Sequence, residues 1–199
     1  MANMTSSAPA AVISAELASA QIEELATLIE RYRDDPRQQV KKACDRAARR
    51  LEKEHREQER VREMYKQMVE LGGNGIVVGV DEVGRGSVAG PLTVCAVCLP
   101  AEPIIWGIND SKQLTPARRE LLAVKIADVA TAVGICHIAP EVIDEIGMAA
   151  ALRRAVAGAV EDTGLVPDCV LMDGNPLGAV PRERNVVHGD AHVACIAAA

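Results

Sequence analysis

The sequence predicts an α/β protein, with a central sheet flanked by helices and a charged helical N-terminal extension before it. Two observations support this prediction. In the second half of the chain, β-branched apolar runs of strand length alternate with segments of helical periodicity. Before them, residues 13–71 show helical spacing and carry most of the Lys and Arg residues. Phe is absent and only two Tyr and one Trp occur, so the core must be largely aliphatic.

Composition divides the chain into three segments. Residues 1–12 are small and lack periodicity, so we expect a flexible leader. Residues 13–75 form the helical extension, which ends at the turn sequence Gly72-Gly73-Asn74-Gly75. Residues 76–199 then form the α/β domain. Its 124 residues suffice for one hydrophobic core.

Two helices are expected in the extension. Apolar residues recur at helical spacing from Ile13 to Arg33, and Pro36 interrupts the pattern. A long charged helix follows over Gln38–Leu71, with a thin apolar stripe and oppositely charged residues three and four positions apart. Two interpretations remain open for this extension: a solvated helical hairpin, or an arm that touches a nucleic-acid backbone or a partner helix.

The α/β segment shows strand and helix signals in alternation. Thr115-Pro116 is a typical helix start, since Thr caps the helix and Pro fits its first turn. Pro140 and Pro167 mark further element boundaries. The expected strands are 76–80, 92–99, 132–138, 168–172 and 186–187, and the expected helices are 115–129, 140–146, 148–161 and 191–199.

Charge and hydropathy exclude several classes of protein. The net charge is −6, and acids outnumber bases after residue 70. Such a domain does not bind nucleic acid by bulk charge alone, but its acids could hold cations. No apolar run reaches the roughly 18 residues of a membrane span. The first 11 residues lack a basic region, so we expect no secretory signal and a reducing cytoplasmic setting.

The pair Cys95-x-x-Cys98 has two interpretations. The spacing could indicate zinc binding or redox activity. However, no second pair follows at zinc-finger spacing, and the two residues lie inside the predicted strand 92–99. We therefore expect both cysteines to pack as small apolar side chains.

Four carboxylates stand where predicted strands give way to glycine: Asp81, Glu82, Asp173 and Asp190. Acids at the ends of buried strands are costly unless a positive group neutralises them. Converging carboxylates prefer Mg²⁺ or Mn²⁺. Taken one at a time, two of these acids also have purely structural interpretations. Asp173, before Gly174, is typical of a turn, and Asp190 could cap the helix that follows it. Adjacent strand residues point to opposite faces, so Asp81 and Glu82 share a site only if the strand ends or bulges there.

Two loops are suited to phosphate. Gly84-Arg85-Gly86 offers close backbone approach and a guanidinium group, and Asp110-Ser111-Lys112 offers hydroxyl and ammonium groups. As bare patterns both also fit ordinary surface loops. A nucleotide-binding α/β domain would need a helix directly after the glycines, where Pro91 and a strand-like run stand instead.

The motifs together resemble one family. Gly79-Val80-Asp81-Glu82-Val83-Gly84-Arg85-Gly86, with Ala89-Gly90-Pro91, is similar to the signature of bacterial ribonuclease HII, a type 2 ribonuclease H. Arg85 favours the HII type over its HIII relative. Further resemblances follow in the family's order: Asn109 to Leu114, Arg119 to Leu121, Ile143-Asp144, Leu171 to Gly174, Gly189-Asp190 and Ile196 to Ala199.

The resemblance implies a ribonuclease H-like mixed sheet and a phosphodiester hydrolase. Its expected partners are RNA–DNA hybrids and duplex DNA with embedded ribonucleotides, with no membrane partner and a monomeric state. Asp81, Glu82, Asp173 and Asp190 correspond to the acids that bind two Mn²⁺ or Mg²⁺ ions. Gly84, Arg85 and Gly86 correspond to the loop that recognises the ribose 2′-OH, and Lys112, beside Ser111, to a phosphate contact. The expected products carry a 3′-hydroxyl and a 5′-phosphate.

The chain departs from the family pattern near its end. Gly147-Met148, His188, His192, Val193 and Cys195 replace the residues usual in the family. His188 and His192 could be pH-dependent phosphate contacts or neutral drift. The family continues past Ala199 with more helix and a stacking aromatic residue, so we expect a domain truncated at its C-terminus. An alternative function follows, a non-catalytic remnant that binds hybrid or metal weakly.

Overall fold

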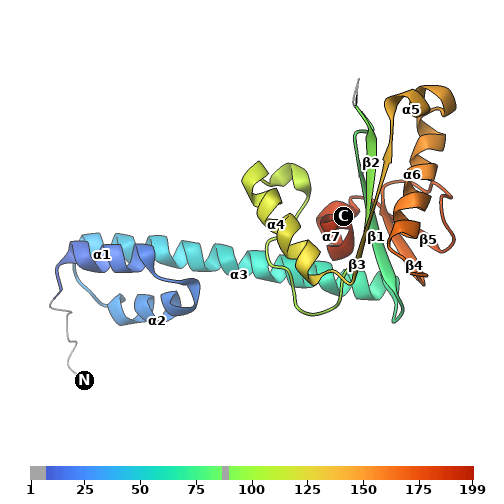
Figure 1. Cartoon of the computed structure of the whole chain (residues 1–199). Coiled ribbons are helices and arrows are strands. Elements are labelled where there is room, and N and C mark those ends of the chain that lie inside the picture. Colours follow the sequence, from blue (N-terminus) through green and yellow to red (C-terminus); the bar gives the residue numbers. More distant parts are fainter. Residues whose placement is uncertain (1–7, 87–89) are drawn as a thin grey trace. The chain divides into compact units, whose positions relative to one another are not determined.

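The structure is a computed structural model that describes residues 8–86 and 90–199 (Figure 1). It contains two compact units, one ending at Glu59 and the other beginning at Arg60. The division falls within the long helix α3 (Gln38–Gly72). The domain boundary after residue 75, inferred from composition, stays a prediction.

The first unit is a small helical assembly. It consists of α1 (Ala10–Ser19), α2 (Ile22–Tyr32) and the first part of α3. Helix α1 begins within the segment that was expected to be a flexible leader; residues 1–7 lie outside the described residues. The apolar side chains buried in this unit come from all three helices: Ile13, Leu17, Leu25, Leu28, Tyr32, Val40, Ala43 and Ala47.

The prediction of one helix over 13–33 is wrong, because the chain breaks between α1 and α2. Ala20 adopts an extended conformation, with φ −58° and ψ 144°. Arg50 of α3 donates hydrogen bonds to the carbonyl oxygens of Ala18, at 2.8 Å, and Ala20. The Arg50 guanidinium thus hydrogen-bonds to carbonyl oxygens that would otherwise be unpaired at the end of α1. The spacing of apolar residues cannot predict this helix end, because Arg50 lies 30 residues away from Ala20.

Asp35 stabilises the entry into α3. Its side chain is only 5% exposed and accepts hydrogen bonds from Arg37 N at 3.0 Å and Arg37 Nε at 2.9 Å. The Arg37 side chain lowers the pKa of Asp35 to about 2. This contribution to stability is complete above pH 4, the range of an unfolded Asp, and is lost as the pH falls toward 2.

We expect Asp35→Asn to lower the melting temperature at pH 7, because Arg37 loses its anionic partner. The difference from the parent chain should shrink as the pH falls from 4 toward 2, where the parent carboxylate also loses its charge. Circular dichroism at 222 nm during heating measures both effects. A difference that is independent of pH would contradict the assigned role of this ion pair.

The second unit is built on a five-stranded mixed sheet with the strand order β3-β2-β1-β4-β5 (Figure 1). β1 (Val77–Val83), β2 (Leu92–Cys98) and β3 (Ala132–Ile138) pair antiparallel, whereas β4 (Cys169–Asp173) and β5 (Glu183–Val186) run parallel to β1. The predicted central mixed sheet flanked by helices is therefore confirmed.

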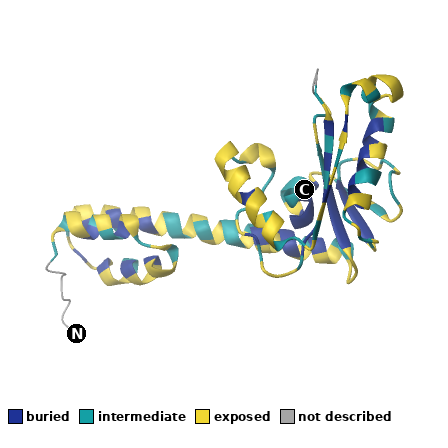
Figure 2. Ribbon diagram, viewed as in Figure 1, coloured by how far each residue is buried: buried dark blue, intermediate teal, exposed yellow. Residues whose placement is uncertain are grey.

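Each sheet face has its own apolar cluster. Figure 2 shows that several strands between the two clusters are largely buried. Helices α5 (Pro140–Ile146) and α6 (Met148–Asp162) belong to the face of Val78 and Val80. The opposite face, that of Val77, packs against the last part of α3, α4 (Pro116–Val129) and α8 (Ala194–Ala198).

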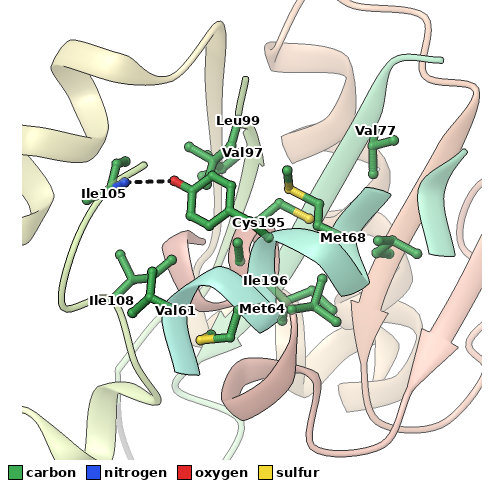
Figure 3. Packing of buried hydrophobic residues seen from close by; sticks show 14 of the residues in the cluster. Val61, Met64, Met68, Val77, Val97, Leu99, Ile105, Ile108, Cys195 and Ile196 are labelled. Atoms are coloured by element: carbon green, nitrogen blue, oxygen red, sulfur yellow. Dashed lines mark hydrogen bonds between the residues drawn. The ribbon is translucent and has the colours of Figure 1, made fainter. Parts of the chain in front are cut away.

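Tyr65 links α3 to the loop between β2 and α4 through a hydrogen bond. Its ring is buried in the cluster of Figure 3, and its hydroxyl accepts a hydrogen bond from Ile105 N at 3.0 Å. Met64 and Met68 lie on the same side of the helix and belong to the same apolar cluster as Cys195 and Ile196 of α8. Residues 60–72 of α3 thus form part of the core of the second unit.

Several predicted boundaries differ from the structure. β1 continues through Asp81 and Glu82 to Val83, beyond the predicted end at residue 80. The last strand is 183–186 instead of 186–187. The expected helix 191–199 is two short helices, α7 (Gly189–His192) and α8, separated by the extended residue Val193.

Cys95 and Cys98 face opposite sides of β2, because they are three residues apart in a strand. Cys95 packs with the α8 cluster and Cys98 with the α6 cluster. The two sulfurs therefore cannot bind the same ion. No helix in the described ranges is long and apolar enough to cross a membrane.

Candidate active site

Asp81 and Asp173 lie side by side on two parallel strands, Asp173 as the last residue of β4 and Asp81 two residues before the end of β1. The pairing of β1 with β4 places Val80 opposite Met172, and Asp81 and Asp173 follow in the same register. Both carboxylates project from the sheet face that carries Gly79 and the buried Leu171. The predicted convergence of these two acids is present in the structure.

Asp190 reaches this site from α7. Asp173 Oδ1 accepts a hydrogen bond from the backbone N–H of Gly189 at 2.7 Å, which ties the start of α7 to the end of β4. His188 precedes α7 in a left-handed conformation with φ 57°. The turn at His188 therefore places Asp190 in the first turn of α7, directly after the residue whose N–H Asp173 accepts.

Glu82 differs from the other three acids. The pairing of β1 with β2 stays regular through Val83 and Thr93, so the bulge that would bring Asp81 and Glu82 to one face is absent. Asp81 Oδ1 accepts a hydrogen bond from Glu82 N at 2.8 Å, whereas the Glu82 side chain pairs with Arg85 at 3.4 Å. Glu82 leaves the strand toward the face of Val80.

The glycine loop continues from β1 next to the acids. Gly84 has φ +97°, and a Cβ atom there would lie 2.4 Å from the carbonyl oxygen of Pro91. Among the described residues, no heavy atom lies within 4 Å of a Cβ atom placed on Gly86, and the Arg85 side chain is 61% exposed. This backbone is accessible to a ligand; residues 87–89 lie outside the described residues.

Lys112 supplies positive charge to the acidic cluster. Its Nζ lies 3.3 Å from Asp190 Oδ2 and 3.6 Å from Asp110 Oδ1. Asp110 accepts a hydrogen bond from Lys112 N at 2.9 Å and so orders the short 3₁₀ turn Ser111–Gln113. Asp190 raises the pKa of Lys112, which stays charged.

Burial and repulsion act together on Asp81. Together, burial and the charges of Glu82, Asp173 and Asp190 raise the pKa of the Asp81 carboxyl to about 6, with burial the largest cause and the hydrogen bond from Glu82 N opposing them. A carboxyl with such a pKa is costly to ionise without a nearby cation. The site therefore favours binding of positive charge.

The donor chemistry fits a divalent ion. Asp81, Asp173 and Asp190 offer oxygen ligands alone, which Mg²⁺ and Mn²⁺ prefer. Among residues 8–86 and 90–199, no three His, Cys, Asp or Glu side chains are yet close enough together to hold one ion. In this structure the Lys112 ammonium group, 3.3 Å from Asp190 Oδ2, places a positive charge next to Asp190.

Sequence reasoning missed the role of Gly79, two residues before Asp81. A Cβ atom at Gly79 would lie 2.2 Å from the carbonyl carbon of Cys195 and 2.5 Å from Ile196 N. The backbone of α8 thus packs directly on β1. The signal was available, because a glycine inside an apolar strand often marks a close backbone approach.

In the metal-free protein, we expect the ionisation of Asp81 to lower stability. The free energy of unfolding should fall as the pH rises from about 4 to about 6, because the unfolded carboxyl ionises first. The site is partly exposed, so we expect an effect of about 1–2 kcal/mol after screening. Asp81→Asn should remove this loss, making the variant more stable than the parent above pH 6.

Urea unfolding in EDTA between pH 4.5 and 8 measures this effect. Asp128→Asn, at an exposed position of α4, is the control and should follow the parent curve. Equal pH dependence in the parent chain and Asp81→Asn would contradict the predicted cost of ionising Asp81.

The mixed sheet, with carboxylates at the ends of β1 and β4, has the ribonuclease H-like α/β fold. The ribonuclease HII family model matches residues 78–199, and the model of the ribonuclease HII N-terminal domain matches residues 10–67. The chain belongs to the ribonuclease HII family.

Individual relatives agree with this assignment. The chain is 39% identical to ribonuclease HII of Listeria monocytogenes serovar 1/2a over 167 residues, 83% of this chain and 64% of the relative. For ribonuclease HII of Bacillus mycoides the identity is 38%, over 83% and 65%. The crystal structure of ribonuclease H2 from Pyrococcus horikoshii OT3 matches with a TM-score of 0.54 and 28% identity, over 61% of this chain and 67% of that chain. The chain spans about 64% of the length of the curated relatives.

Proposed function

We propose that this chain is an endoribonuclease that hydrolyses RNA in RNA–DNA hybrids and at ribonucleotides embedded in duplex DNA. The proposed products carry a 3′-hydroxyl and a 5′-phosphate. One observation carries the proposal: Asp81 and Asp173 occupy neighbouring positions on β1 and β4, and α7 adds Asp190 beside them. Membership of the ribonuclease HII family supports the reaction class.

Asp81, Glu82, Asp173 and Asp190 are the residues proposed to hold two Mg²⁺ or Mn²⁺ ions. When bound, the ions would supply an activated water and stabilise the leaving oxygen of an in-line displacement. Glu82 has to turn from Arg85 toward the Asp81 face to take part. Asp173 is held in place by Gly189 N–H, so its second oxygen stays available for a cation.

The loops beside the acids are proposed to grip the substrate. The backbone of Gly84 and Gly86 can approach a ribose closely, because neither residue carries a side chain. The 2′-hydroxyl is the group that distinguishes RNA from DNA, and it accepts and donates hydrogen bonds. Arg85 is exposed next to this backbone, and Lys112 and Ser111 are exposed across the acids, where they can contact phosphates.

Cleavage of a labelled DNA duplex containing one ribonucleotide tests the proposal. With Mg²⁺ or Mn²⁺, we expect a single nick at the ribonucleotide, and ligation chemistry can verify the 3′-hydroxyl. The same duplex without the ribonucleotide is the control and should stay intact. Binding without cleavage would favour the non-catalytic alternative, and nicking of both duplexes would contradict the proposed specificity. The monomeric state and cytoplasmic location stay predictions.

A further inference from the structure

A stripe of basic side chains runs along the first half of α3. Its members follow each other at spacings of four and three residues: Lys42, Arg46, Arg49, Lys53 and Arg56. At 3.6 residues per turn these positions lie within an arc of about 80° and extend along about 21 Å of the helix. All five residues are exposed. Figure 2 shows exposed positions along the length of α3.

The described part of the first unit, residues 8–59, leaves this basic stripe uncovered. Val40, Ala43 and Ala47 of the same helix are buried against α1 and α2. By helical phase they lie on the other side of α3 from the centre of the stripe. The stripe is therefore presented outward by the packing that holds the three helices together.

Most of the stripe's charge is uncompensated within the described ranges, where no ion pair involves Lys42, Arg46, Arg49 or Lys53. Arg56 pairs with Glu52 at 3.2 Å, and both side chains are largely exposed. Such exposed pairs contribute little and exchange readily for other partners. The stripe is thus available to an external anion.

The surrounding surface favours a nucleic-acid partner. The large apolar side chains that are exposed in the described structure lie elsewhere, and none falls within residues 38–59. Protein interfaces concentrate apolar and aromatic residues at their centre, and membrane-surface helices need an apolar face. Phosphate backbones require only Lys and Arg, and 21 Å corresponds to about six base-pair steps of duplex.

We propose that the basic stripe of α3 binds the phosphate backbone of a nucleic-acid duplex, without reading its sequence. Binding to a duplex backbone is argued from the charge of the stripe alone. The proposal rests on the proposed function only in saying which duplex, one that contains RNA, is the natural ligand. It resolves the alternatives left open for the helical extension in favour of a backbone-contacting arm. The stripe also gives this net-acidic chain a local positive surface, in a part of the sequence that precedes Asp81 and Asp173.

The test uses the full chain and an all-DNA duplex, which the proposed reaction does not cleave. Fluorescence anisotropy gives the Kd at several salt concentrations for the parent, for R49Q/K53Q and for the control K66Q/K125Q. Both variants lose two positive charges at exposed positions, and Gln preserves helix propensity. Circular dichroism confirms that each remains helical.

We expect R49Q/K53Q to bind about ten- to a hundredfold more weakly at 50 mM salt, and its salt slope to fall by about 1.8. The control should stay within about twofold of the parent. Equal Kd values and slopes for R49Q/K53Q and the control would overturn the proposal, as would binding of an acidic protein with no binding of DNA. If the parent binds DNA through the stripe but never nicks the ribonucleotide duplex, the proposed function fails and the stripe proposal stands.

Discussion

Asp173→Asn should lower the rate of nicking at a single ribonucleotide by at least about 1,000-fold, equivalent to roughly 4 kcal/mol of transition-state stabilisation. Asn has nearly the same shape as Asp, and its side-chain oxygen can still accept the hydrogen bond from Gly189 N–H. The substitution therefore keeps the contact between β4 and α7. It removes the negative charge that lies next to Asp81 at the strand ends.

Single-turnover cleavage of the ribonucleotide duplex at saturating enzyme measures this loss. Asp128→Asn makes the same chemical change at an exposed position of α4 and should retain the parent rate. Thermal unfolding should show that Asp173→Asn is folded. Nicking at the parent rate by a folded Asp173→Asn protein would exclude the proposed role of this carboxylate.

Gly79→Ala should destabilise the second unit by about 3 kcal/mol or more. The added methyl group would meet the backbone of Cys195 and Ile196, and backbone atoms cannot move aside as a flexible side chain can. Helix α8 must then separate from β1, which exposes Cys195 and Ile196, both fully buried in the parent. Because only Val193 separates α7 from α8, Asp190 should move with α8 and activity should fall as well.

Urea unfolding of the parent and the variant measures the change in free energy. Gly86→Ala is the matched control for stability, since none of the described residues would contact the added Cβ atom, and it should change the free energy by less than about 0.5 kcal/mol. Equal stability of Gly79→Ala and Gly86→Ala would show that α8 does not pack on β1 as described.

Much of the fold was predictable because local signals agreed with the final structure. Thr115 caps α4 by accepting a hydrogen bond from Arg118 N at 3.3 Å, as the Thr-Pro start indicated. The apolar runs at 92–99 and 132–138 form β2 and β3. In such segments the residues that favour the strand or helix are also the residues that the core buries. The sequence pattern alone therefore predicts the element.

The errors arose where distant residues decide the conformation. Arg50 satisfies the end of α1 from another helix, and the pairing of β2 extends β1 through two acids that have no strand pattern of their own. Val193 lies in extended conformation between α7 and α8 because its buried side chain packs in the sheet cluster. None of these partners is near in sequence.

The sequence by itself determined the family, the order of the elements from α3 to β5, and the four acids that were singled out as candidates. Only the tertiary structure decided which acids come together. Parallel pairing of β1 with β4 joins Asp81 to Asp173, the turn at His188 adds Asp190, and the regular β1–β2 ladder turns Glu82 away. Strand register, strand order and the close packing of one backbone on another depend on contacts between segments far apart in the sequence. The burial of apolar side chains from several segments decides them together, so no local pattern predicts them.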